Sequence, residues 1–147
     1  MQTTSRLIFA DLSHTFAYAL LKRLHVGRLA YSLHDRVDIQ PVNYVFDDGW
    51  IVGRTQVGSK LSTLTHNPWC AFEVDDVRGL FDWDSVVARG SFHILDPEQG
   101  SVDRYRRALT VLRELIPGTL TADDPAPERS ILFGVHVDEM TGRSART

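Results

Sequence analysis

The chain is poor in cysteine and lacks any long apolar run. A single cysteine, Cys70, among 147 residues excludes an intramolecular disulfide and any metal site built from several cysteines. Cys70 lies in the apolar stretch 69–72, so we expect a buried, unreactive thiol. No apolar run approaches the roughly 20 residues that span a bilayer, and the N-terminus does not resemble a signal peptide. These absences predict a cytoplasmic protein with no membrane partner.

The charge balance excludes further classes of partner. The formal net charge is −3, so the chain has no basic excess that would favour a nucleic acid or an anionic membrane surface. Charged residues make up 24% and hydrophobic residues 43%, as in an ordinary soluble globular protein. The length predicts a single domain over residues 1–147. Lysine is scarce, because 14 of the 16 basic residues are arginine and only Lys22 and Lys60 are lysine.

Common catalytic motifs are missing as well. The sequence contains no Walker A loop, no dinucleotide-binding glycine fingerprint, no zinc-binding histidine pair on a helix and no nucleophile elbow. Its six histidines are scattered and none is closely spaced with another, so we expect no metal site. The Ser, His and Asp residues show no spacing that marks a triad. The residues therefore single out no catalytic group.

Hydrophobic periodicity predicts six or more strands, mostly in sequential hairpins, and three helices. Because strands and helices do not alternate strictly, a small antiparallel barrel with helices at its ends fits better than a doubly wound parallel sheet. The expected strands are 27–34, 37–40, 42–46, 50–55, 69–75, 83–95 and 131–138, and the expected helices are 13–25, 59–65 and 96–116. A loop over 76–82, a Pro-rich loop over 117–130 and a polar tail over 141–147 complete the expected chain.

The rest of the chain is organised around residues 41–60. Residues 42–46 alternate with a period of two, which predicts a strand with one face on the core. Asp48-Gly49 then predicts a tight hairpin turn, because glycine tolerates positive φ, and Trp50 resumes the strand. Pro41 inside the strand pattern indicates an edge position or a bulge.

A candidate anion site follows this hairpin. Thr55 and Ser59 supply hydroxyls, Gly58 supplies accessible backbone amides and Lys60 supplies an ammonium group, all close to the expected start of a helix. A terminal phosphate needs several such donors from a compact backbone, and a helix N-terminus favours an anion. Simple capping of the helix by Gly-Ser-Lys explains the same residues equally well, so both interpretations stay open at this point.

Several local strings carry a family resemblance. They are VGRLAYS, QPVNYVFDDGWIVGRT, GSKLSTL, NPWCAFEVDD, WDSVVARGSF and VHVDEMTGR, and together they cover most of residues 26–143. In order and content they resemble the pyridoxamine-5'-phosphate-oxidase-like family of FMN-binding split barrels, in its small, single-domain, nitroimidazole-reductase-like branch. The resemblance implies a mainly β fold with helices (α+β), a six-stranded antiparallel split β-barrel. It also implies a homodimer with FMN at the interface, acting as an oxidoreductase on an unidentified small molecule.

The resemblance assigns roles to individual residues. It implies that the FMN phosphate is held by Thr55, Ser59 and Lys60, in agreement with the anion site above that includes Gly58. It implies that the isoalloxazine ring is lined by Val42, Asn43 and Tyr44. The start of the long strand, with Trp83 and Ser85, matches a segment that approaches the flavin, in one arrangement from the neighbouring subunit.

Two departures from the family pattern limit the implied chemistry. Arg54 stands where the nitroimidazole-reductase-like relatives often carry His. Its guanidinium can pair bidentately with a phosphate, but it cannot act as an acid–base group near neutral pH. The chain also stops soon after Arg143, without the substrate-binding C-terminal segment of true pyridoxamine-phosphate oxidases. Oxidation of vitamin B6 is therefore not expected.

Other interpretations stay open beside this one. The same fold could hold a deazaflavin, or it could hold haem with His93 or His136 as the iron ligand. A dimer that binds a flavin or senses a ligand without turnover is a third alternative. The strand aromatics, Tyr44 among them, are most simply core residues, and Trp69 is a candidate dimer contact.

Overall fold

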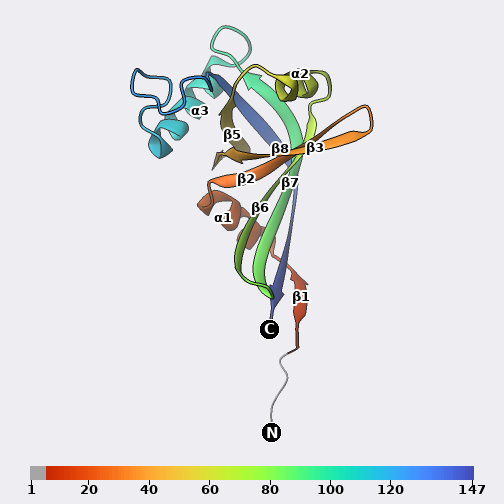
Figure 1. Cartoon of the computed structure of the whole chain (residues 1–147). Helices are drawn as coiled ribbons and strands as arrows, with labels where there is room; N and C mark the ends of the chain where they lie inside the picture. Colours follow the sequence, from red (N-terminus) through yellow and green to blue (C-terminus); the bar gives the residue numbers. More distant parts are fainter. Residues whose placement is uncertain (1–5) are drawn as a thin grey trace.

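The computed structural model describes residues 6–147, the side chain of Ser59 excepted. Within this part of the chain there are eight strands and three helices (Figure 1). In chain order they are β1 (Ile8–Asp11), α1 (His14–Arg23), β2 (Val26–Leu33), β3 (Arg36–Asn43), β4 (Val45–Asp47), β5 (Trp50–Thr55), α2 (Ser59–His66), β6 (Trp69–Gly79), β7 (Asp82–Leu95), α3 (Val102–Leu115) and β8 (Ile131–Arg146).

The strands form one antiparallel sheet. Its order is β3-β2-β6-β7-β8-β5-β4, and β1 pairs with the far end of β8. The two longest strands, β7 and β8, lie at its centre and run side by side along the length of the molecule (Figure 1). Along β7 buried and partly exposed residues alternate, so one face of the strand belongs to the core. Pro41 lies in the edge strand β3, as predicted, where its missing N–H leaves no second neighbour unpaired.

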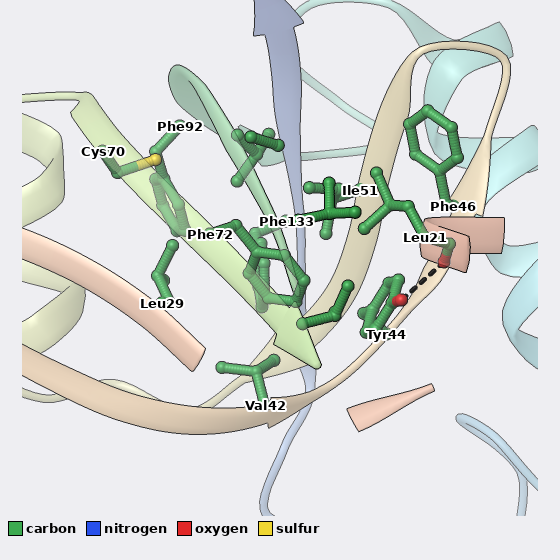
Figure 2. Close-up of a cluster of buried hydrophobic side chains, with 14 of the residues drawn as sticks. Leu21, Leu29, Val42, Tyr44, Phe46, Ile51, Cys70, Phe72, Phe92 and Phe133 are labelled. Atoms are coloured by element: carbon green, nitrogen blue, oxygen red, sulfur yellow. Dashed lines mark hydrogen bonds between the residues drawn. The ribbon is translucent and has the colours of Figure 1, made fainter. Parts of the chain in front are cut away.

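The main core joins the inner face of the sheet to one face of α1 (Figure 2). The rings of Tyr44 and Phe72 meet edge to face at its centre, with their centroids 4.8 Å apart. The Tyr44 hydroxyl donates a hydrogen bond to the carbonyl oxygen of Leu21 in α1, at 2.5 Å. Cys70 is buried in the same cluster, as predicted. A second, smaller cluster packs Ala108, Val111 and Leu112 of α3 against Val52, Leu95 and Leu132 of the sheet.

The predicted turn at residues 48–49 is confirmed, but the strand before it is interrupted. Asp48 and Gly49 both have positive φ, 50° and 79°, and they join β4 to β5. The expected single strand 42–46 is divided at Tyr44, whose N–H donates to His25 instead of to a neighbouring strand. The first part of this run pairs with β2 and the second with β5, so the chain passes here between the two ends of the sheet.

The end of the chain differs from the prediction. Residues 141–147 were expected as a polar tail, yet β8 continues to Arg146. Its last residues pair with β7 on one side and with β1 on the other, and Ala145 is fully buried between them. The partner strand β6 likewise runs to Gly79, four residues beyond its predicted end at Asp75, because it pairs with β7 through most of that stretch.

The third helix begins later than predicted. Asp96 was expected to cap it, but α3 starts at Val102, and the N-cap is Ser101, whose hydroxyl accepts from the N–H of Arg104. Asp96 accepts from the N–H of Glu98, so the carboxylate forms a local turn with the same chemistry as a cap. None of the helices in the described chain is long and apolar enough to cross a membrane.

Candidate functional site

A cavity of about 400 Å³ opens where β5 ends and α2 begins. Three segments that are distant in the sequence line it. Residues 54–58 and Lys60 form the junction itself, and residues 40–42 of β3 form a second part. The third part is the loop before β8, through Glu128 and Arg129. The structure thus brings most of the predicted phosphate residues to one cavity, and adds a loop that was not predicted to belong to it.

The junction leaves backbone donors facing this cavity. Thr55 is buried at the last position of β5, where it pairs with Ile131 of β8. Gly58 is the N-cap of α2, and within the described chain no side chain caps its first turn. Gly58 adopts an extended φ of 174°, and a Cβ added there would meet nothing within 4 Å. This glycine is therefore not required by its backbone conformation. Because it has no side chain to cap the helix, the first N–H groups of α2 stay available for a ligand. The side chain of Ser59 lies outside the described residues.

Lys60 is the cation closest in sequence to these amides. Burial, and secondly the positive charge of Arg129, lower the pKa of Lys60 below its ordinary value. Across residues 6–147, neither Lys60 nor Arg129 forms an ion pair with a carboxylate within 4.0 Å. Two cations that line one cavity and repel each other favour the binding of an anion between them.

The structure corrects the role suggested for Arg54. Its guanidinium lines the cavity but forms a bidentate pair with Asp124, with N–O distances of 2.5 and 2.7 Å. Both side chains are almost fully buried in this pair. The hydrogen bonds from Arg54 hold the pKa of Asp124 well below its usual range. The donors expected to bind a phosphate bidentately are therefore engaged by a carboxylate.

The three residues expected at the flavin ring are separated. Val42 is buried and lines the cavity. Asn43 is exposed at the end of β3, where it pairs with Val26 of β2. Tyr44 points into the core, where its hydroxyl contacts α1 (Figure 2). The structure places this side chain in the core, and Tyr44 is not among the residues that line the cavity.

Trp83 and Ser85 lie at the other end of the molecule. Trp69 follows α2 closely in the chain, and it pairs with Ser91 of β7, so Ser91 marks the end of β7 near α2. Trp83 lies further along β7, toward the turn with β6. At about 3.3 Å per residue this places Trp83 roughly 26 Å from Ser91. Trp83 packs beside Phe9 of β1, and the Ser85 hydroxyl donates to a carboxylate oxygen of Glu73 at 2.9 Å. One chain therefore does not bring these residues to the cavity of Lys60.

The two histidines considered as haem ligands flank an aromatic ring. The Trp50 ring lies 5.5 Å from the ring of His93 and 5.0 Å from that of His136, between centroids. The Arg104 guanidinium lies 4.6 Å from the centroid of the same Trp50 ring. Gly134 lies beside this ring, since a Cβ added there would approach Trp50 to 2.8 Å. This cluster stands apart from the cavity of Lys60 and shares no lining residue with it.

Sequence reasoning missed three residues of this region. Asp124, Glu128 and Arg129 all belong to the loop 117–130, which was expected only as a Pro-rich connection. The cluster of charges in DDPAPER is the signal available in the sequence, since so many ionisable groups in a short loop require partners or solvent. The partner of Asp124 is Arg54, 70 residues away in the chain, so spacing alone does not reveal this pair.

Residues 13–144 match the family model of pyridoxamine 5'-phosphate oxidase. The chain belongs to this family. An uncharacterised protein of Mycobacterium tuberculosis is 30% identical over 134 residues, which cover 86% of this chain and 84% of the relative. The predicted family is therefore confirmed over nearly the whole chain.

Solved structures confirm the fold as well. An FAD-binding protein from Mesorhizobium loti superposes with a TM-score of 0.77 at 23% identity, covering 95% of this chain and 99% of the other. A candidate 5-nitroimidazole antibiotic resistance protein from Bacteroides thetaiotaomicron gives a TM-score of 0.71 at 15% identity, covering 96% and 90%. The fold is the predicted split barrel, and its eight strands exceed the expected six.

Proposed function

We propose that the protein is an FMN-dependent oxidoreductase that binds its flavin at a homodimer interface and acts on a small molecule. The observation that carries the proposal is the cavity where β5 meets α2, with Lys60 and the uncapped first turn of α2 directed to one place. Membership of the family supports flavin as the ligand. The name of the Mesorhizobium loti structure supports it too, and FAD contains the FMN phosphate.

The donors of the cavity suit a phosphate monoester. The Lys60 ammonium and the N–H groups of the first turn of α2 would hold its oxygens, and the Thr55 hydroxyl would donate a further bond. Thr55 donates only a long bond, 3.4 Å, to the carbonyl of Gln56, so this hydroxyl is available. Arg54 would act indirectly, by fixing the end of β5 through Asp124. When bound, the flavin supplies the redox chemistry, while the protein binds and orients it.

Exposed apolar side chains support the homodimer. Val37 of β3 and Trp69 of β6 line one shallow depression on the outer face of β3, β2 and β6, and they are 77% and 56% exposed. Large apolar groups gathered on one face favour burial against another surface. A second copy covering this region would also give Trp83 and Ser85 a route to the flavin. Sedimentation of the purified protein at several concentrations tests the dimer, and a monomer at all of them would remove the interface from the proposal.

The first test is the visible spectrum of the purified protein and the mass of what denaturation releases. Released FMN supports the proposal, whereas a deazaflavin or a haem band keeps the fold and changes the chemistry. The apo-protein is then titrated with FMN. Replacing Lys60 by Ala should weaken binding by about 1.5–3 kcal/mol, or roughly 10- to 150-fold, since Lys60 would donate hydrogen bonds from a charged group to the phosphate.

Lys22→Ala is the matched control, because Lys22 is the other lysine of the chain and is exposed on α1. Equal FMN affinities for wild type and Lys60→Ala would remove Lys60 from the site. Turnover of a reduced nicotinamide with an electron acceptor separates an enzyme from a protein that only holds flavin. A protein that binds FMN but shows no turnover with any donor would contradict the oxidoreductase part alone.

A further inference from the structure

The loop 117–130 is held in one shape by a single buried carboxylate. Asp124 accepts hydrogen bonds from the N–H groups of Leu120 and Ala126, at 2.8 and 2.9 Å, so it closes the loop on itself. The same carboxylate accepts both bonds from Arg54 of β5. Four donors thus converge on Asp124, and they join the loop to the strand that leads into the cavity.

Other contacts fix the two ends of the loop. Thr119 is buried, and its carbonyl accepts from the Arg113 guanidinium of α3 at 2.9 Å. At the other end the N–H of Arg129 donates to the carbonyl of Ala126, which forms a turn just before β8. The loop is therefore a built part of the fold, and Ala126 links its two halves, since its N–H donates to Asp124 and its carbonyl accepts from the N–H of Arg129.

The residues that the loop delivers to the cavity are charged. Arg129 and Glu128 both line it, and Arg129 lies close enough to Lys60 to influence its titration. Arg54 also lines the cavity, but its charge is balanced by Asp124. Lys60 and Arg129 are thus the two cations of the lining that remain for a bound anion, and Glu128 opposes them.

We propose that Arg129 is a second cationic ligand for the phosphate of the flavin nucleotide, and that Arg54 and Asp124 are positioning residues that hold its loop at the cavity. This inference rests on the proposed function. It adds that two segments distant in the chain, the start of α2 and the loop 117–130, bind the phosphate together. The chemistry recognised is a flavin phosphate ester, which FMN and FAD share. The proposal rests on three observations, which are the cavity, the loop and the buried ion pair.

The test titrates the apo-protein with FMN, FAD and riboflavin. Arg129→Gln should weaken FMN binding on the order of tenfold and leave riboflavin binding unchanged, because riboflavin has no phosphate. The affinity for FMN should also fall less steeply with added salt in this variant, since an exposed cation contributes a screened attraction. FAD is titrated in parallel, and the nucleotide that loses more affinity is the one whose phosphate Arg129 contacts.

Arg106→Gln is the matched control, because Arg106 is an exposed arginine of α3 that lines neither the cavity of Lys60 nor the depression beside Trp50. Glu128→Gln should strengthen FMN binding, since it removes the opposing charge. Unchanged FMN affinity and salt dependence in Arg129→Gln, in a protein that binds FMN, would overturn the inference and leave the proposed function standing. Failure of the wild type to bind any flavin would overturn the proposed function itself.

The positioning role is tested by a double-mutant cycle. Arg54→Lys keeps the charge but loses the bidentate geometry, so it should loosen the loop and weaken FMN binding. In the Arg129→Gln background the same change should have little further effect, because its consequence passes through Arg129. A second cycle pairs Asp124→Asn with Arg129→Gln. Circular dichroism verifies that each variant folds. Losses that simply add would show that the ion pair acts independently of Arg129.

Discussion

Tyr44 has two possible roles, one in the core and one at the flavin ring. Removing its hydroxyl distinguishes them. Tyr44 is fully buried, and its ring packs edge to face on Phe72. Its hydroxyl donates to the carbonyl of Leu21, in the last turn of α1, where the carbonyls have no partner within the helix. Burial raises the pKa of Tyr44 well above its ordinary value, so the hydroxyl remains a donor at neutral pH.

Replacing Tyr44 by Phe keeps the ring and removes this one bond. The Leu21 carbonyl is then left buried without a partner, which costs about 1–3 kcal/mol of unfolding free energy. For a chain of this length each kcal/mol lowers Tm by roughly 3 °C. Because the ring lies in the core and not at the cavity, the affinity for FMN should be unchanged in the folded variant.

Urea unfolding followed by tryptophan fluorescence measures the first effect, and FMN titration measures the second. Tyr18→Phe is the matched control, because Tyr18 is 36% exposed and packs by its ring on Phe46. The Tyr18 hydroxyl donates no hydrogen bond to any other residue of 6–147. Removing this hydroxyl should therefore change the free energy of unfolding by less than about 0.5 kcal/mol. Weaker FMN binding in Tyr44→Phe, with unchanged stability, would refute the structural role and restore this residue to the flavin ring.

Two further predictions concern the sheet around Cys70. Gly90→Ala should destabilise the protein by about 1–3 kcal/mol in urea unfolding, because a Cβ there would approach the carbonyl oxygen of His136 to 1.9 Å, whereas a Cβ at Gly79 would meet only the Cβ of Asp82, at 3.9 Å, so Gly79→Ala should be nearly neutral. The pairing of β7 with β8 shifts register between Arg89 and Gly90, and a stable Gly90→Ala variant would show that the backbone can adjust at this irregularity. Burial raises the pKa of the Cys70 thiol from 9.0 to about 12, so the contribution of Cys70 to stability should be constant at neutral pH and fall as the pH rises through 9 toward 12, because this thiol ionises there only in the unfolded chain. A Cys70→Ala variant should lose this alkaline component, and the folded wild type should react slowly with a thiol reagent at pH 8; rapid reaction would place the thiol outside the core.

Elements that depend on neighbouring residues were predictable from the sequence. The turn at Asp48-Gly49, the start of α1 next to Ser13 and the edge position of Pro41 all follow from local backbone chemistry. The buried thiol of Cys70 followed from its apolar neighbours. These features need no knowledge of the distant chain, which is why periodicity and turn chemistry reveal them.

The errors have a common cause in long-range pairing. Residues 141–147 are polar and were expected as a tail, but residues 143–145 pair with β1 on one side and with β7 on the other, which makes this segment part of a strand. The start of α3 was misplaced because Asp96 forms a turn with the same hydrogen bond that caps a helix. At the cavity, Thr55 and Lys60 were grouped in the prediction because they are close in the chain, whereas Arg129 reaches the same cavity from a distant loop that no local pattern marks.

The length of β7 constrains how the remaining predicted residues can contribute. Lys60 lies at one end of the barrel, and Trp83 and Ser85 lie near the turn between β6 and β7 at the other end (Figure 1). The roughly 26 Å between Ser91 and Trp83 along β7 is set by the strand rise, so no side-chain rearrangement within one chain removes it. If both ends serve one flavin, they must belong to different copies of the chain. In a two-fold dimer each copy would then give its phosphate residues to one site and its β6–β7 turn to the other, so the proposed roles of Trp83 and Ser85 require the proposed homodimer.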